Sequence, residues 1–236
     1  GLQNDPVTQF VSYSRSLKKN LGIGLSIVND KTFISKQTDI VIDLSYKLQL
    51  DRKTDLYFGM KAGGVVNNID FASLELNDPI FGSSISSFNP TMGVGAHIKG
   101  ERFYLDLSVP NLLLSDVQKP VMDNIGEYTE TVNAKLHLYL GGGYRISVSE
   151  KLDLTPSIFT RIVADQDALI DISTVADISN LVEAGVTYRV GTSFIGSVML
   201  KLIENTHFGY AYESVTSDFS NVSRGTHEFI LRFKFN

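Results

Sequence analysis

The sequence predicts an all-β fold, a transmembrane antiparallel β-barrel, from three observations. Apolar and polar residues alternate along almost the whole chain of 236 residues, and a period of two is typical of β-strands. Many alternating segments exceed the usual strand length of about 5–6 residues and reach the about 9–11 residues that cross a bilayer. The connections are short at one end of the predicted strands and include every long one at the other, as in outer-membrane barrels.

Residues 20–30, which read NLGIGLSIVND, illustrate the pattern. Leu21, Ile23, Leu25 and Ile27 occupy one face, and only glycine and serine lie between them. In a barrel of this class the apolar face meets lipid and the polar face lines the lumen. We therefore expect the four aliphatic residues to face lipid.

The same alternation predicts about thirteen strands in this chain and no helix. We expect one barrel domain over residues 1–236. Bacterial single-chain barrels usually have an even number of strands, so a strand before Gly1 is expected, which makes fourteen in the complete protein. A soluble β-sandwich remains the alternative fold. The predicted strands are residues 7–16, 20–30, 38–50, 56–66, 92–99, 103–109, 134–148, 152–161, 168–173, 182–189, 194–202, 208–213 and 228–235.

Composition narrows the function classes. A net charge of −5 and a pI of about 5.4 argue against nucleic acid as a partner. The chain has no cysteine, and it lacks HxxxH and HExxH patterns, so no metal or cofactor site is predicted. His97 and His137 lie on the predicted polar face, but without a GxSxG elbow a barrel hydrolase is a minor alternative. We expect no enzyme.

Charges of both signs occupy the predicted inner face. They include Asp43, Lys47, Lys61, Asp171 and Arg189. A pore selective for one charge would gather a single sign at its constriction. We therefore expect ion pairs across the lumen of a narrow barrel, with a water-filled pore as the alternative.

Two long outer connections are unusually apolar. Setting Phe235 at the periplasmic end places residues 67–90 and 110–131 outside, where loops rich in apolar side chains suggest a cap or a protein-binding surface. We expect partner contacts from the larger apolar residues of these loops, namely Phe71, Leu74, Leu76, Ile80, Phe81, Phe88, Leu112, Leu113, Met122 and Tyr128.

The chain resembles the PorP/SprF family of outer-membrane proteins from bacterial type IX secretion and gliding-motility systems. The resemblance rests on five motifs in order: KKNLGIGLSIVNDK, LYFGMKAGGVVNNIDFASLELNDP, FNPTMGVGAHIKGERFYLDLSVPNLL, HFGYAYE and GTHEFILRFKF. Two features differ from the family. Its usual N-terminal segment and following strand are not found, and the last residue is Asn236 instead of an aromatic.

The resemblance implies a non-enzymatic outer-membrane barrel that helps to export or anchor a large secreted, adhesin-like protein through the C-terminal domain of that protein. It also implies a periplasmic peptidoglycan-binding lipoprotein as a partner, and it carries over no catalytic or cofactor residue. We expect the secreted partner to dock on the outer loops. The alternative function is a channel or transporter for small solutes.

Overall fold

The structure, a computed structural model, describes residues 6–18, 20–70, 84–113, 117–123, 126–132, 135–216 and 225–235. These ranges contain β-strands joined by turns, and no helix within them is long and apolar enough to cross a membrane. The strands are β1 Val7–Lys18, β2 Leu21–Thr32, β3 Ser35–Gln49, β4 Asp55–Asp70, β5 Ser84–Lys99, β6 Phe103–Val109, β7 Val117–Asp123, β8 Gly126–Val132, β9 His137–Tyr144, β10 Ile146–Ser149, β11 Leu152–Val163, β12 Leu169–Ile178, β13 Val182–Arg189, β14 Ser193–Ile203, β15 Thr206–Val215 and β16 Thr226–Phe233.

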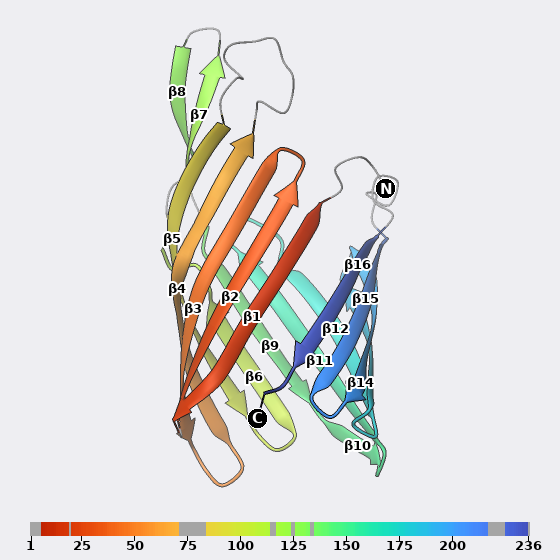
Figure 1. Cartoon of the computed structure of the whole chain (residues 1–236). Helices are drawn as coiled ribbons and strands as arrows, with labels where there is room; N and C mark the ends of the chain where they lie inside the picture. Colours follow the sequence, from red (N-terminus) through yellow and green to blue (C-terminus); the bar gives the residue numbers. More distant parts are fainter. Residues whose placement is uncertain are drawn as a thin grey trace. The chain divides into compact units, whose positions relative to one another are not determined.

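Fourteen of these strands form one antiparallel sheet (Figure 1). Its order is β1-β2-β3-β4-β5-β6-β9-β11-β12-β13-β14-β15-β16, with β10 paired to β11. Only Arg145 separates β9 from β10, so the two continue one strand, and the path has the thirteen positions that the alternation predicts. Among the described residues, β1 and β16 end this path and the sheet is open between them.

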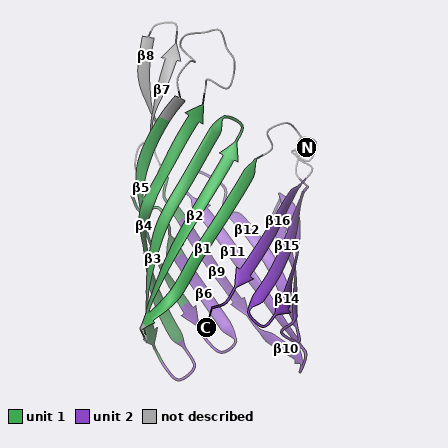
Figure 2. Cartoon of the chain, in the orientation of Figure 1, with its two compact units in different colours: residues 1–50, 55–97, 108–137 green, residues 51–54, 98–107, 138–236 purple. Residues whose placement is uncertain are grey.

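The chain divides into two compact units (Figure 2). Unit 1 comprises Gly1–Leu50, Asp55–His97 and Ser108–His137. Unit 2 comprises Asp51–Thr54, Ile98–Leu107 and Leu138–Asn236. Consecutive strands pair within each unit in long registers. The register from Leu21–Tyr46 to Thr32–Ser35 between β2 and β3 is unbroken, whereas β1 with β2 and β14 with β15 shift register close to their short turns.

Burial along the strands is inverted relative to a water-soluble protein. On β3, Ile40, Ile42 and Leu44 are 48%, 50% and 52% exposed, whereas Asp43 and Lys47 on the opposite face are half-buried. A soluble sheet would bury its aliphatic face and expose its charged face. The apolar face of this sheet therefore lies on the outside.

The described residues contain almost no hydrophobic core. Val41 and Val163 are the buried hydrophobic side chains of that part of the chain, at 8% and 6% exposed. Burial of apolar surface is the main force that folds a protein in water, so such a sheet needs lipid as its apolar surroundings. The predicted transmembrane antiparallel β-barrel class is confirmed.

The connections sort by length between the two ends of the sheet. One end has short turns throughout, at residues 19–20, 50–54, 100–102, 150–151, 179–181 and 204–205. We call the other the long-connection end; its connections are residues 33–34, 71–83, 110–136, 164–168, 190–192 and 216–225. The predicted sorting is confirmed.

The predicted loop boundaries need correction at this end. β4 continues to Asp70 and β5 begins at Ser84, so the connection predicted at 67–90 shortens to 71–83. The segment predicted as a loop at 110–131 contains the strands β7 and β8. Polar residues such as Asn67 and Asn68 had suggested a loop, but both pair with β3.

Candidate functional site: the base of the excursion between β6 and β9

Between the neighbouring strands β6 and β9 the chain leaves the main sheet. We call residues 110–136 the excursion. It holds the hairpin of β7 and β8, which pair from Val117–Val132 to Asp123–Gly126 in a separate two-stranded sheet. In the described ranges, each of these strands pairs with the other alone, so the outer edge of each is open. Open strand edges are a common binding site for an extended peptide.

The side chain of Asn111 ties the two ends of the excursion together. Its Nδ2 atom donates a hydrogen bond to the carbonyl oxygen of Lys135 at 2.8 Å, and its Oδ1 atom accepts one from the backbone nitrogen of His137 at 3.0 Å. An asparagine amide can replace a peptide group in such a pair because it offers the same donor and acceptor. Asn111 thus continues the strand pairing beyond the last residue of β6.

The start of the excursion also contacts β5. The backbone nitrogen of Leu112 donates to the carbonyl oxygen of Met92 at 2.7 Å. A Cβ atom on Gly93 would lie 2.7 Å from the Cα atom of Pro110, closer than such atoms approach. Gly93 is therefore the residue that lets the chain turn away at Pro110. Together these contacts hold the base of the excursion against the main sheet.

The structure separates the predicted partner-contact residues into three groups. Leu112 and Leu113 lie at the start of the excursion and are 40% and 46% exposed. Met122 lies on β7 opposite Glu127, and Tyr128 lies on β8 opposite Val121. The third group falls in residues 71–83, outside the described residues, and comprises Phe71, Leu74, Leu76, Ile80 and Phe81.

Phe88 does not belong with the other predicted contacts. It lies on β5, and a Cβ atom on Gly64 of β4 would meet its ring at 2.1 Å. Gly64 pairs with Ile40, a residue of the outward apolar face, so the ring of Phe88 covers that face. An aromatic residue there fits the interfacial girdle of a barrel. Its placement in an outer loop was wrong.

The structure describes one contact for each of the two inner histidines. The ring of His97 lies 5.8 Å from that of Tyr57, tilted by 47°, and the backbone of His137 is bonded to Asn111. The described ranges hold no group of three His, Asp or Glu residues that could bind a metal ion.

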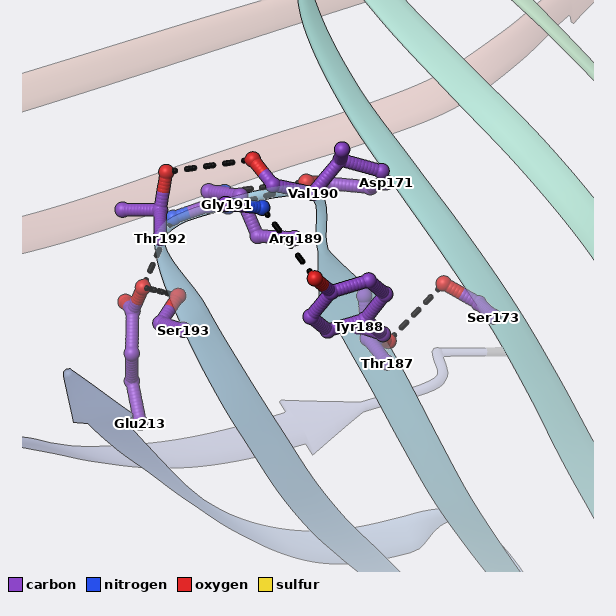
Figure 3. A network of polar contacts seen from close by, with 10 residues as sticks. All are labelled: Asp171, Ser173, Thr187, Tyr188, Arg189, Val190, Gly191, Thr192, Ser193 and Glu213. Atoms are coloured by element: carbon purple, nitrogen blue, oxygen red, sulfur yellow. Dashed lines mark hydrogen bonds and ion pairs between the residues drawn. The ribbon is translucent and has the colours of Figure 1, made fainter. Parts of the chain in front are cut away.

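A charged cluster lies at the long-connection end of β12 to β15 (Figure 3). The guanidinium of Arg189 holds both carboxylate oxygens of Asp171, at 2.9 and 3.0 Å, and the Oε1 atom of Glu213 at 2.8 Å. The Ser193 hydroxyl, which is fully buried, donates to the same Glu213 oxygen. Ser193 pairs with Arg189 in the sheet, and its small side chain lets the guanidinium reach over β14 to Glu213.

This cluster corrects the predicted pairing of inner charges. Asp171 and Arg189 are direct partners on the neighbouring strands β12 and β13, and Lys47 on β3 pairs with Asp55 on β4 at 2.6 Å. These pairs run along the wall, so pairing across the lumen was wrong for them. Ser193 is not among the predicted residues; the strand register that places it beside Arg189 is the signal that would have found it.

An antiparallel sheet of long strands with its aliphatic face outward defines a β-barrel membrane protein. The chain belongs to the family of type IX secretion system membrane proteins PorP/SprF, whose family model matches residues 1–233. It is thus an outer-membrane component of that secretion system, as the sequence motifs imply.

A search of curated proteins found no match. Among solved structures, the chain is similar to a Pseudomonas aeruginosa FadL homologue, with 12% sequence identity and a TM-score of 0.45, covering 95% of this chain and 74% of that one. At that TM-score the likeness supports no inference about function.

Proposed function

We propose that this protein docks a secreted, adhesin-like surface protein at the cell surface through its excursion, as a step in the export or anchoring of that protein. Membership of a secretion-system family supports the class of function. Docking itself is supported by one observation: a hairpin whose outer strand edges are open in the described ranges is anchored to the main sheet at Asn111. We place the long-connection end outside, because long loops of outer-membrane barrels face the exterior.

The docked element is the C-terminal domain of the secreted protein. An extended strand of that domain would pair with β7 or β8, where main-chain hydrogen bonds give affinity and side chains at alternate positions give specificity. Leu112, Leu113, Met122 and Tyr128 would supply apolar contacts beside it, and residues 71–83 would add theirs. At the opposite end, the short turns would face the periplasm and a peptidoglycan-binding lipoprotein.

The experiment compares three tagged forms of the full chain recovered from native membranes. One is unchanged, one has residues 114–133 replaced by a short turn, and the control has residues 217–224 replaced in the same way. We expect a large secreted protein with a C-terminal sorting domain to accompany the unchanged and control forms, and to be lost with the excursion. Equal recovery from all three forms would contradict docking on the excursion.

A second candidate, passage of small solutes, is favoured by a groove of about 650 Å³ along β1 to β3. Its lining combines small polar residues such as Ser12 and Ser14, the charged Arg15 and Asp43, and apolar residues such as Leu25. Conductance in planar bilayers tests this candidate. Full ion conductance together with unchanged secretion in the form without the excursion would favour the channel over docking.

A further inference from the structure

Two lysines lie directly opposite each other near the tip of the hairpin formed by β2 and β3. Lys31 pairs with Lys36, and Lys36 pairs on its other side with Asn68 of β4. Both lysines are exposed. They lie on the outward face, because the alternation that places Ile27 and Ile40 outside continues without a register shift to Lys31 and Lys36.

Like charges opposite each other in a sheet destabilise it. Asp70 ends β4 on the same face, yet within the described ranges no ion pair joins either lysine to a carboxylate. A bound anion would remove this repulsion. The pair is therefore arranged to hold one anionic group between two cations.

On the same face, the residue pairs of β2 and β3 change from charged to polar to apolar from the lysines toward the middle of the strands; we call each such pair a row. Directly beneath them, Asn29 pairs with Thr38, and the Thr38 hydroxyl donates to the Oδ1 atom of Asn29 at 3.1 Å. This leaves the Nδ2 group of Asn29 as a donor. The next row is apolar, with Ile27 and Ile40 at 39% and 48% exposed, and there the Phe88 ring covers Gly64.

This level corresponds to the edge of the lipid bilayer. On β3 the outward apolar residues run from Ile40 to Leu48. The distance from Ile40 to Leu48 is about 26 Å along the strand at about 3.3 Å per residue, and a tilt of about 45° reduces it to roughly 19 Å, near the height of the apolar band of a barrel. The lysines lie just beyond this band, where lipid headgroups begin.

From this arrangement, and resting on the orientation given under the proposed function, we infer that Lys31, Lys36 and Asn29 bind the phosphorylated headgroup of an outer-leaflet lipid, whose acyl chain lies along Ile27, Ile40 and Phe88. The two lysines would meet the phosphate of such a lipid, and the Asn29 amide would meet the polar linkage between headgroup and acyl chain. The aliphatic surface that follows would meet the acyl chain itself. A free phosphate ion would use the lysines but gain nothing from the apolar row. The ligand is therefore a lipid.

The test uses the full chain in detergent micelles and native mass spectrometry. The probes are lipid A, the same lipid after removal of its phosphate, and inorganic phosphate. The main variant is Lys31→Gln/Lys36→Gln. A matched control, Lys53→Gln/Lys151→Gln, removes two exposed lysines from the short turns at the other end. Lys31→Arg/Lys36→Arg keeps the charge.

We expect the unchanged chain, the control and the arginine form to bind lipid A equally. The main variant should lose about tenfold or more in affinity, because each lysine adds attraction to an anionic lipid. Equal binding of lipid A by the main variant, or equal binding of the dephosphorylated lipid, would overturn the inference. Displacement of lipid A by millimolar inorganic phosphate would show a site for free phosphate and would also overturn it.

Discussion

The backbone nitrogen of His137 donates to the Oδ1 atom of Asn111 at 3.0 Å, although the two residues are 26 positions apart in sequence. The same side chain donates to the carbonyl oxygen of Lys135. One amide group thus holds together the two ends of the excursion. If the excursion docks a partner, this clamp determines how firmly the docking surface is held.

Replacement of Asn111 by alanine should loosen the excursion without unfolding the barrel. Both hydrogen bonds are lost, and a typical hydrogen bond contributes only about 1 kcal/mol. We expect faster proteolysis within residues 112–134 and faster amide exchange at His137. Asn111→Asp keeps the acceptor for His137 and loses the donor to Lys135. Its rate of proteolysis should therefore lie between that of the unchanged chain and that of the alanine variant. Unchanged proteolysis of the alanine variant would exclude a clamp at this residue.

Arg189→Met should destabilise the sheet by about 2 kcal/mol. The change leaves the half-buried carboxylates of Asp171 and Glu213 without their shared charged donor, and hydrogen bonds to charged groups contribute about 1.5–3 kcal/mol. The free energy of unfolding in urea, measured in lipid vesicles, is the quantity to compare. The control is Lys53→Met, which breaks the Lys53–Glu101 pair.

The Lys53–Glu101 side chains are 67% and 58% exposed, so their loss should cost less than about 1 kcal/mol. If Arg189→Met lowers the free energy of unfolding no more than Lys53→Met does, the cluster around Arg189 does not stabilise the sheet.

The outward face of β3 gives a direct test of lipid exposure. Leu44 lies in the middle of the apolar row, and Thr38 lies on the same face beyond its end. An arginine at the bilayer midplane costs about 2–4 kcal/mol in a barrel, and one at the interface about 0–1 kcal/mol. Leu44→Arg should therefore destabilise the protein far more than Thr38→Arg. Equal costs in vesicle unfolding would mean that this face does not meet lipid.

The free edge of β1 leads to another prediction. Every residue of β1 whose exposure is described is exposed, on both faces, and within the described ranges β1 pairs with β2 alone. Unpaired backbone groups in lipid cost several kcal/mol each. We predict that a further antiparallel strand pairs with this edge in the membrane. The β1 amides that face away from β2 should then exchange as slowly as those of β3, whereas rapid exchange would show an unpaired edge.

Alternation in the sequence predicts the strands of the main sheet, their outward faces and the short turns, because a period of two runs along most of these strands, but it does not predict β7 and β8. It could not predict the ends of β4 and β5, where polar residues such as Asn67 and Asn68 continue a strand beyond the bilayer. A strand does not need apolar residues once it has left the lipid. Phe88, which covers Gly64, was predicted in a loop because polar residues flank it on β5.

The candidate site was predicted only in part. Leu112, Leu113, Met122 and Tyr128 all belong to the excursion, but no sequence pattern indicates the clamp at Asn111, since its partners lie beyond the hairpin. The cluster around Arg189 was hidden for a similar reason. Its members come from four strands, and only the register of each pair brings them to the same level.

The most direct test of docking is photocrosslinking on intact cells. A photoreactive amino acid would replace Met122 on β7, with Leu44 on the lipid-facing row and Lys53 in a short turn as control positions. We expect a crosslink from position 122 to a secreted protein with a C-terminal sorting domain, and none to that protein from positions 44 and 53. No crosslink from position 122, with that secreted protein reaching the cell surface normally when residues 114–133 are replaced, would contradict it.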